Sequence, residues 1–97
     1  MKREVRFTPL AAKDIEEAFE WYESQRVGLG SEFEAVVDQM VRLLTEMPEL
    51  GPELHGDLRR VLLVRFPYAL YYRLGDLIEV RGCLHLRRSP AIPRRRA

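Results

Sequence analysis

Apolar residues recur at helical spacing over two long stretches of this 97-residue sequence. In the first stretch, residues 9–25, Ile15 and Phe19 lie on one stripe and charged residues lie on the opposite face. Thr8 has the side chain of an N-cap residue, and proline is favoured directly after it, at the first helical position. The pattern predicts an amphipathic helix from Pro9 to about Gln25.

A second apolar stripe follows after a glycine-containing break at residues 27–30. Ser31 and Glu34 match a capping box, so we expect this helix to run from Glu32 to about Met47. A loop this short joins helices that pack antiparallel, as a helical hairpin. The apolar stripe consists of Phe33, Val36, Val37, Met40, Leu44 and Met47.

Alternating and apolar segments predict strands at residues 4–7, 59–66, 68–74 and 77–86. Gly75 and Asp76 predict a hairpin turn between the last two. The predicted fold is therefore α+β with the order β-α-α-β-β-β, a small antiparallel sheet covered on one face by an α-helical hairpin. Strict alternation in the last strand places one set of side chains towards the helices: Ile78, Val80, Leu84 and Leu86. The other set lies on the uncovered face and consists of Glu79, Arg81, Cys83, His85 and Arg87. We expect Arg73, on the neighbouring strand, to lie on this face too.

Length and composition limit the class of protein. The chain has room for a single domain, which we assign to residues 1–88, followed by a basic, flexible tail at 89–97. Its apolar content of 46% and charged content of 32% are typical of soluble globular proteins. No apolar run approaches the roughly 18 residues of a membrane span, and no signal core follows the N-terminus. Cys83 is alone, which fits a reducing cytoplasm.

The charges are strongly segregated along the chain. Residues 58–97 hold ten of the sixteen basic residues, all arginine, and only two acids, whereas residues 1–57 hold thirteen acids and six bases. Arginines interleaved with aromatic residues suit an anionic partner such as nucleic acid, or a protein that handles it. The alternative is an ordinary domain with solvated strand faces. Cys83 and His85 are too few for a metal site, so we expect no metal and no cofactor.

Several short motifs, taken in order, resemble the RelE/ParE superfamily of toxins from bacterial toxin–antitoxin operons. The resemblance covers Val5 to Pro90. The matching pieces are Val5-x-Phe7-Thr8-x-x-Ala11 leading into Asp14-Ile15; Glu20-Trp21-Tyr22; Gly28-Leu29-Gly30-x-x-Phe33; Arg60-x-Leu62-Leu63-x-Arg65-Phe66-Pro67-Tyr68; Tyr72-Arg73; and His85-x-x-Arg88.

The resemblance implies a toxin of a type II (plasmid stabilisation) system, with a cognate antitoxin and a cytoplasmic location. RelE-like members cleave mRNA on the ribosome, and ParE-like members act on DNA gyrase. No tyrosine follows Tyr72, although RelE-like chains usually carry a late one, and the ending at residues 85–90 resembles the ParE type. Ile92 stands where a tryptophan is common in that ending. We favour the ParE-like branch; RelE-like cleavage and a non-toxic binding module derived from this fold remain alternatives.

Candidate site residues follow from these alternatives. In a ribonuclease the stabilising and proton-transfer groups would come from Arg65, Arg81 and His85, but a second proton carrier is not evident. The alternative, which we favour, is that His85 is a structural strand residue. For a target such as gyrase, or the ribosome and mRNA, we expect contacts from Arg73, Arg81, His85, Arg87 and Arg88. For the antitoxin, which could form a hetero-oligomer with the toxin, the resemblance implies Trp21 and Tyr22.

Overall fold

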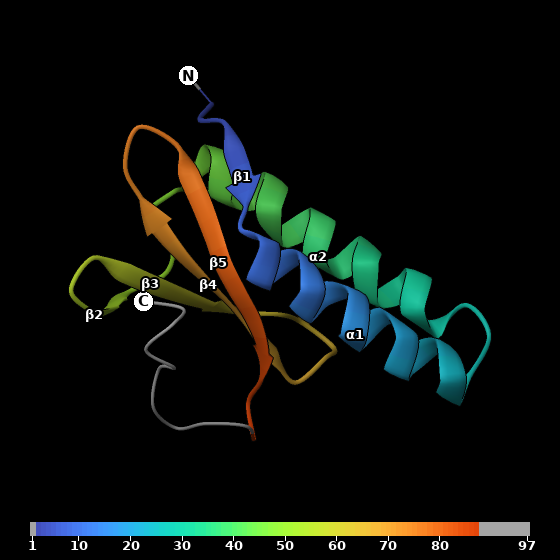
Figure 1. Ribbon diagram of the computed structural model, residues 1–97. Coiled ribbons are helices and arrows are strands. Elements are labelled where there is room, and N and C mark those ends of the chain that lie inside the picture. Colours follow the sequence, from blue (N-terminus) through green and yellow to red (C-terminus); the bar gives the residue numbers. More distant parts are fainter. Residues whose placement is uncertain (1, 88–97) are drawn as a thin grey trace.

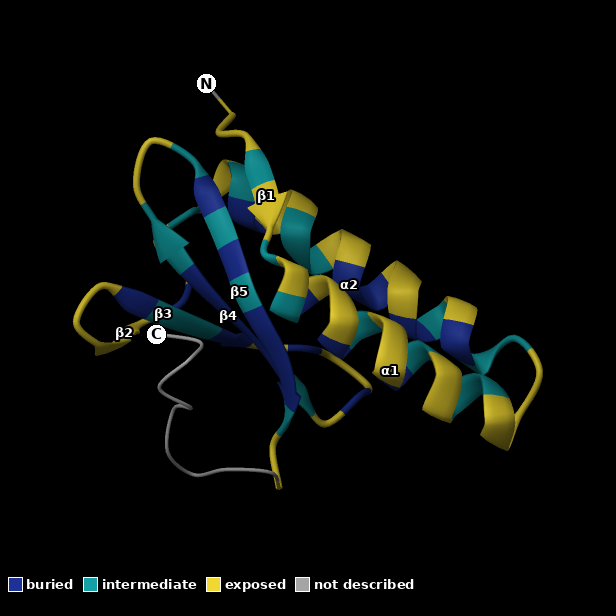
Figure 2. Ribbon diagram, viewed as in Figure 1, coloured by how far each residue is buried: buried dark blue, intermediate teal, exposed yellow. Residues whose placement is uncertain are grey.

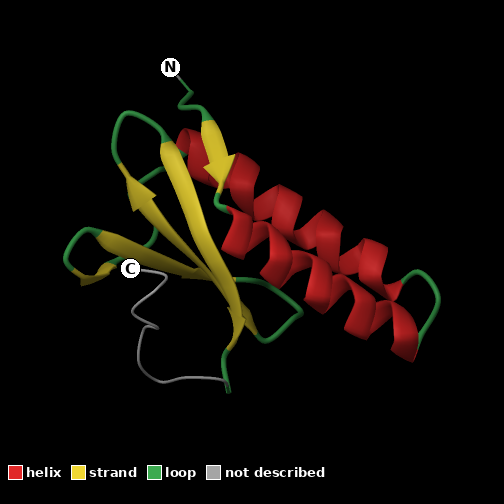
Figure 3. Cartoon of the chain, in the orientation of Figure 1, coloured by secondary structure: helices red, strands yellow, loops and turns green. Residues whose placement is uncertain are grey.

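The computed structural model describes residues 2–87 and shows two layers, a helical hairpin and a five-stranded sheet (Figures 1 and 3). The predicted α+β class and the covering hairpin are confirmed. The proposed tail at 89–97 and Arg88 lie outside the described residues. The elements are β1 (Val5–Phe7), α1 (Pro9–Gln25), α2 (Leu29–Glu46), β2 (Glu53–His55), β3 (Leu58–Leu62), β4 (Tyr68–Leu74) and β5 (Ile78–His85).

The sheet differs from the prediction in two details. Its order is β1-β5-β4-β3-β2, and β1 pairs parallel with β5, so the sheet is mixed rather than wholly antiparallel. The N-terminal strand and β5 are joined by nearly the whole chain, a crossover long enough for parallel pairing. The short strand β2, which the sequence pattern did not indicate, pairs with the start of β3.

The first helix has its predicted bounds and cap, because the Ala11 N–H donates to Thr8 Oγ1 at 3.1 Å. The second begins at Leu29, three residues before the predicted start, so the capping box at Ser31 is wrong. Both Glu23 carboxylate oxygens, on α1, instead accept from the N–H groups of Gly28 and Gly30 at 2.9 Å. A carboxylate from the neighbouring helix therefore satisfies the N-terminal amides of α2. Neither helix in residues 2–87 meets the length and apolarity that crossing a membrane requires.

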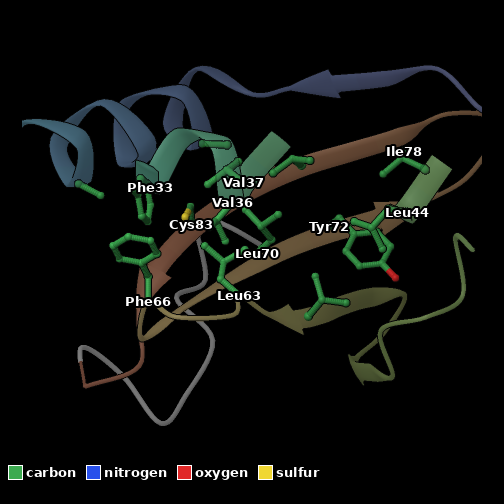
Figure 4. Packing of buried hydrophobic residues seen from close by; sticks show 14 residues of the cluster. Phe33, Val36, Val37, Leu44, Leu63, Phe66, Leu70, Tyr72, Ile78 and Cys83 are labelled. Carbon is green, nitrogen blue, oxygen red and sulfur yellow. The ribbon is translucent and has the colours of Figure 1, made fainter. Parts of the chain in front are cut away.

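The core lies between the hairpin and one face of the sheet (Figures 2 and 4). Buried side chains of α2 form one cluster with residues of β4, β5 and the β3–β4 connection; Phe33, for example, packs against Phe66 and Tyr68. Tyr72 is fully buried, as predicted. The labelled members of this core are Phe33, Val36, Val37, Leu44, Leu63, Phe66, Leu70, Tyr72, Ile78 and Cys83. A second, smaller cluster on the opposite face of the sheet consists of Leu58, Ala69, Tyr71 and Leu84.

A β-bulge in β5 corrects the predicted faces of that strand. Tyr71 pairs with Gly82 and Tyr72 with Val80, so Arg81 is the extra residue. An extra residue reverses the in-and-out alternation beyond it. Cys83 consequently belongs to the helix-side core, and Leu84 belongs to the opposite cluster. The prediction that Cys83 and His85 share the uncovered face with Arg81 was wrong.

Candidate functional site

His85 lies at a hollow between α1 and the sheet. The hollow encloses about 380 Å³ and is lined by Asp14, Glu17, Ala18, Trp21, Tyr68, Cys83 and His85. Tyr68 meets the imidazole edge-on, with the ring centres 5.1 Å apart. The Arg87 N–H donates to His85 Nδ1 at 3.0 Å, which assigns the proton of the neutral ring to Nε2. A backbone amide just beyond the end of β5 thus orients the imidazole, which lies on the helix side of the sheet.

Asp14 and Cys83 join α1 to β5 beneath this hollow. The Cys83 N–H donates to Asp14 Oδ2 at 3.0 Å, and both side chains are buried. Burial, assisted by the nearby Asp14 carboxylate, raises the pKa of the Cys83 thiol to about 12. The thiol is therefore neither a nucleophile nor a ready metal ligand at neutral pH.

Arg73 and Arg81 lie on the uncovered face, as predicted, but carboxylates neighbour both. Arg73 Nε donates to Asp57 Oδ1 at 2.8 Å, and Arg81 Nη1 pairs with Glu79 on its own strand. These pairs offset much of the positive charge of that face. Arg87 follows β5 and is exposed, without an ion pair inside the described range.

Arg65 lies elsewhere, in the β3–β4 connection. Its φ of 69° is in the left-handed region, which is uncommon for a side chain of this size. Arg65 Nη2 donates to Glu32 Oε1 at 2.7 Å, and Arg26 contacts the other oxygen at 3.1 Å. The guanidinium also lies over the ring of Phe66, 5.1 Å from its centre. The two arginines, Arg65 foremost, hold the pKa of Glu32 below its usual value.

The two residues expected to contact the antitoxin have different environments. Trp21 is 59% exposed at the rim of the hollow, so its ring is available to a partner. Tyr22 belongs to an aromatic cluster, with its ring centre 4.8 Å from that of Phe66 and 5.4 Å from that of Phe33. Burial raises its pKa. Tyr22 therefore packs against the core while remaining partly exposed, and its contact with an antitoxin stays a prediction.

Sequence reasoning missed an apolar groove on the far side of the hairpin. The groove, which we call the α2–β3 groove, runs between α2 and the edge of β3 and contains two hollows. The signal in the sequence was the unbroken apolar run at residues 61–64. Successive side chains of a strand point to opposite faces, so the four side chains of this run cannot all enter one core. The two hollows are lined by Val36, Gln39, Met40, Leu43, Leu50, Pro52, Arg60, Val61, Leu62 and Val64.

Comparison with known proteins identifies the family. The model of the ParE toxin of the type II toxin–antitoxin system parDE matches residues 5–90. One similar solved structure is described as the chromosomal ParDE TA system from P. aeruginosa. It superposes with a TM-score of 0.65 at 16% identity, over 87% of this chain and 96% of that one. This structural likeness supports the fold. No curated protein sequence matches significantly.

Proposed function

This chain belongs to the ParE toxin family of type II toxin–antitoxin systems, and on that premise we propose that it inhibits growth by acting on DNA gyrase and is neutralised by a cognate antitoxin. The finer points, gyrase as target and an antitoxin as inhibitor, rest on the family and on the site geometry together. This function would operate in the cytoplasm, where both partners occur.

The observation that carries the choice of gyrase over RNA is the bulge at Arg81. Cleavage of RNA by its 2′-hydroxyl needs a base, an acid and a cation around one phosphate. The bulge directs Arg81 to the uncovered face and His85 to the hollow beside α1. Arg65 is held by Glu32 in the β3–β4 connection. The three ribonuclease candidates therefore do not converge on one phosphate, which favours a toxin that works by binding.

For the target contact we propose the end of β5 and the residues that follow it. Arg73 and Arg81 are already paired with carboxylates of the chain itself, and they would have to break these ion pairs before they could bind a carboxylate or phosphate of a target. Arg87 is exposed. Arg88 extends the same basic segment, outside the described residues. The acidic N-terminal segment, which includes both helices, would orient the molecule with its basic end towards an anionic surface.

Expression of the chain in a bacterium, with DNA supercoiling and mRNA integrity followed in parallel, tests this function. We expect growth arrest with loss of negative supercoiling and intact mRNA, relieved by co-expression of the antitoxin encoded beside the chain. Charge reversal at Arg87 and Arg88 should relieve the arrest while thermal stability stays near wild type. Codon-spaced mRNA breaks that vanish in His85→Ala or Arg65→Ala would establish the ribonuclease alternative instead.

A further inference from the structure

The N-terminal strand β1 forms one edge of the sheet, and its outer side is open (Figure 1). The backbone of the even-numbered residues bonds to β5; the Ile78 N–H, for example, donates to the Glu4 carbonyl at 2.8 Å. Successive N–H and C=O groups of a strand point to opposite sides, so those of Val5 and Phe7 point away from β5. No strand among residues 2–87 pairs with this outer side. An extended chain can therefore add here.

An exposed aromatic ring lies beside this open edge. The Phe7 side chain is 41% exposed, and together with Ile15 and Val37 it lines a hollow of about 260 Å³. Aromatic side chains dominate the energetics of interfaces, because each buries a large apolar area. A strand added along β1 would cover the ring of Phe7 and pair the outward backbone groups in the same step.

The charges of this segment favour a second copy of the same chain as the partner. Val5 packs against the core, so Glu4 and Arg6 lie on the opposite face by alternation. Their side chains are 64% and 67% exposed and form an ion pair at 3.2 Å. An edge with charges of one sign would repel a copy of itself, whereas this edge carries one charge of each sign. Because a two-fold axis presents the same surface from both subunits, such an edge can be complementary to itself.

The charges also select one register for the pair. In an antiparallel pair, a residue that faces the partner lies opposite another that does so, which leaves registers centred on Glu4, Val5 or Arg6. A centre at Glu4 or Arg6 places like charges directly opposite each other, which is destabilising. A centre at Val5 places Glu4 opposite Arg6 of the second copy, and the two-fold axis repeats this contact. The register centred on Val5 is therefore the favoured one.

The same register brings a cation to the exposed ring. Phe7 lies opposite Arg3 of the second copy, and a guanidinium over an aromatic face is attracted by the ring. Glu34 and Asp38 also line the hollow beside Phe7, so two carboxylates lie near this position. Within one chain the exposed Arg3 donates to the Gly75 carbonyl at 2.6 Å, a surface hydrogen bond that the dimer would replace.

We infer that this chain forms a two-fold symmetric dimer in which the β1 edges of two copies pair antiparallel about Val5. The two five-stranded sheets then become one continuous sheet, with both helical hairpins on the same face. The paired segment is short, and small interfaces are weak, so we expect a Kd on the order of 10–100 µM. The inference goes beyond the proposed function and depends on neither gyrase nor an antitoxin.

Sedimentation equilibrium of the purified chain tests the inference by charge reversal. Glu4→Arg and Arg6→Glu each place like charges opposite each other at both symmetric contacts, so each should raise the Kd of the dimer by about tenfold or more. The double variant, Glu4→Arg with Arg6→Glu, restores opposite charges and should dimerise within about threefold of wild type. Glu20→Arg makes the same change as Glu4→Arg at an exposed position on α1 and should leave the dimer unchanged.

An equimolar mixture of the two single variants separates pairing between copies from the ion pair within one chain. Neither variant keeps the internal Glu4–Arg6 pair, but in a mixed dimer every opposed pair again has opposite signs. The mixture should therefore dimerise about as well as the double variant.

Hydrogen exchange measures the pairing directly. The amides of Val5 and Phe7 should exchange rapidly in dilute protein and slowly in concentrated protein, whereas the Arg6 amide faces β5 and should be protected in both. Val5→Pro removes an outward N–H without touching the bonds to β5, so it should abolish the dimer and leave the chain folded. A chain that stays monomeric at about 1 mM, well above the expected Kd, would overturn the inference. So would a dimer that both single charge reversals leave unchanged, or a mixture that associates no better than its components.

Discussion

The hydroxyl of Tyr72 anchors the loop that forms one wall of the α2–β3 groove, and its removal should be costly. The Tyr72 O–H donates to the Pro48 carbonyl at 2.8 Å and accepts from the Gly51 N–H at 2.9 Å. Leu50 and Pro52 of the same loop line the groove. Tyr72→Phe keeps the ring and deletes both bonds, so it isolates the contribution of the hydroxyl.

The expected magnitude follows from these two bonds. Each contributes about 1 kcal/mol net, and the buried Gly51 N–H, left without its acceptor, adds up to about 1 kcal/mol more. The total of about 2–3 kcal/mol should lower Tm by about 10–20 °C for a domain of this size.

Tyr71 is the matched control for this change. It is the neighbouring tyrosine, is also buried, and its hydroxyl has no hydrogen bond to any residue in the described part of the chain. Tyr71→Phe should therefore change the free energy of unfolding by no more than about 0.5 kcal/mol. Thermal and urea unfolding of both variants measure the difference. If Tyr72→Phe melts within a few degrees of Tyr71→Phe, the hydroxyl does not anchor the loop.

Three other predictions concern the helix contact, pH and the thiol. Gly30→Ala should cost about 1–3 kcal/mol, since the new Cβ would lie 2.7 Å from the Phe19 carbonyl oxygen, whereas Gly75→Ala, with open space around it, should be nearly neutral by urea unfolding. The pKa of Glu32 is lower in the folded than in the unfolded protein, so its contribution to stability is present above pH 4.5 and is lost as the pH falls through the pKa of the folded state. The difference in Tm between wild type and Glu32→Gln should therefore become smaller from pH 7 to pH 3. A difference that stays constant would contradict this. Cys83 should resist a thiol reagent at pH 8 until denaturant is added, and rapid reaction of the native protein would show that the thiol is not buried.

Local signals were sufficient for most of the fold. The Thr8–Pro9 pair indicated the start of α1, and the mainly apolar segment at residues 68–74 matched β4. The mixed sheet was not predictable in the same way, because the pairing of β1 with β5 joins residues more than seventy positions apart. The capping of α2 by Glu23 likewise depends on how two helices pack and not on the sequence at the cap.

The candidate site was less predictable, because a single extra residue in β5 changed which side chains share a face of the sheet. Arg81 bulges out of β5, and the faces of Cys83 and His85 are reversed as a result. Gly82 was a signal of this, since a glycine inside a strand often marks a bulge. The α2–β3 groove was missed because its edge depends on where β2 stops pairing, which is a property of the folded sheet.

The central claim, a toxin that acts by binding gyrase, is tested most directly with purified components. We expect the chain to inhibit DNA supercoiling by gyrase at a stoichiometry near one, and the antitoxin to restore it. Arg87→Glu with Arg88→Glu should lose inhibition while retaining antitoxin affinity. Undiminished supercoiling, together with cleavage of ribosome-bound mRNA by the same preparation, would contradict the account.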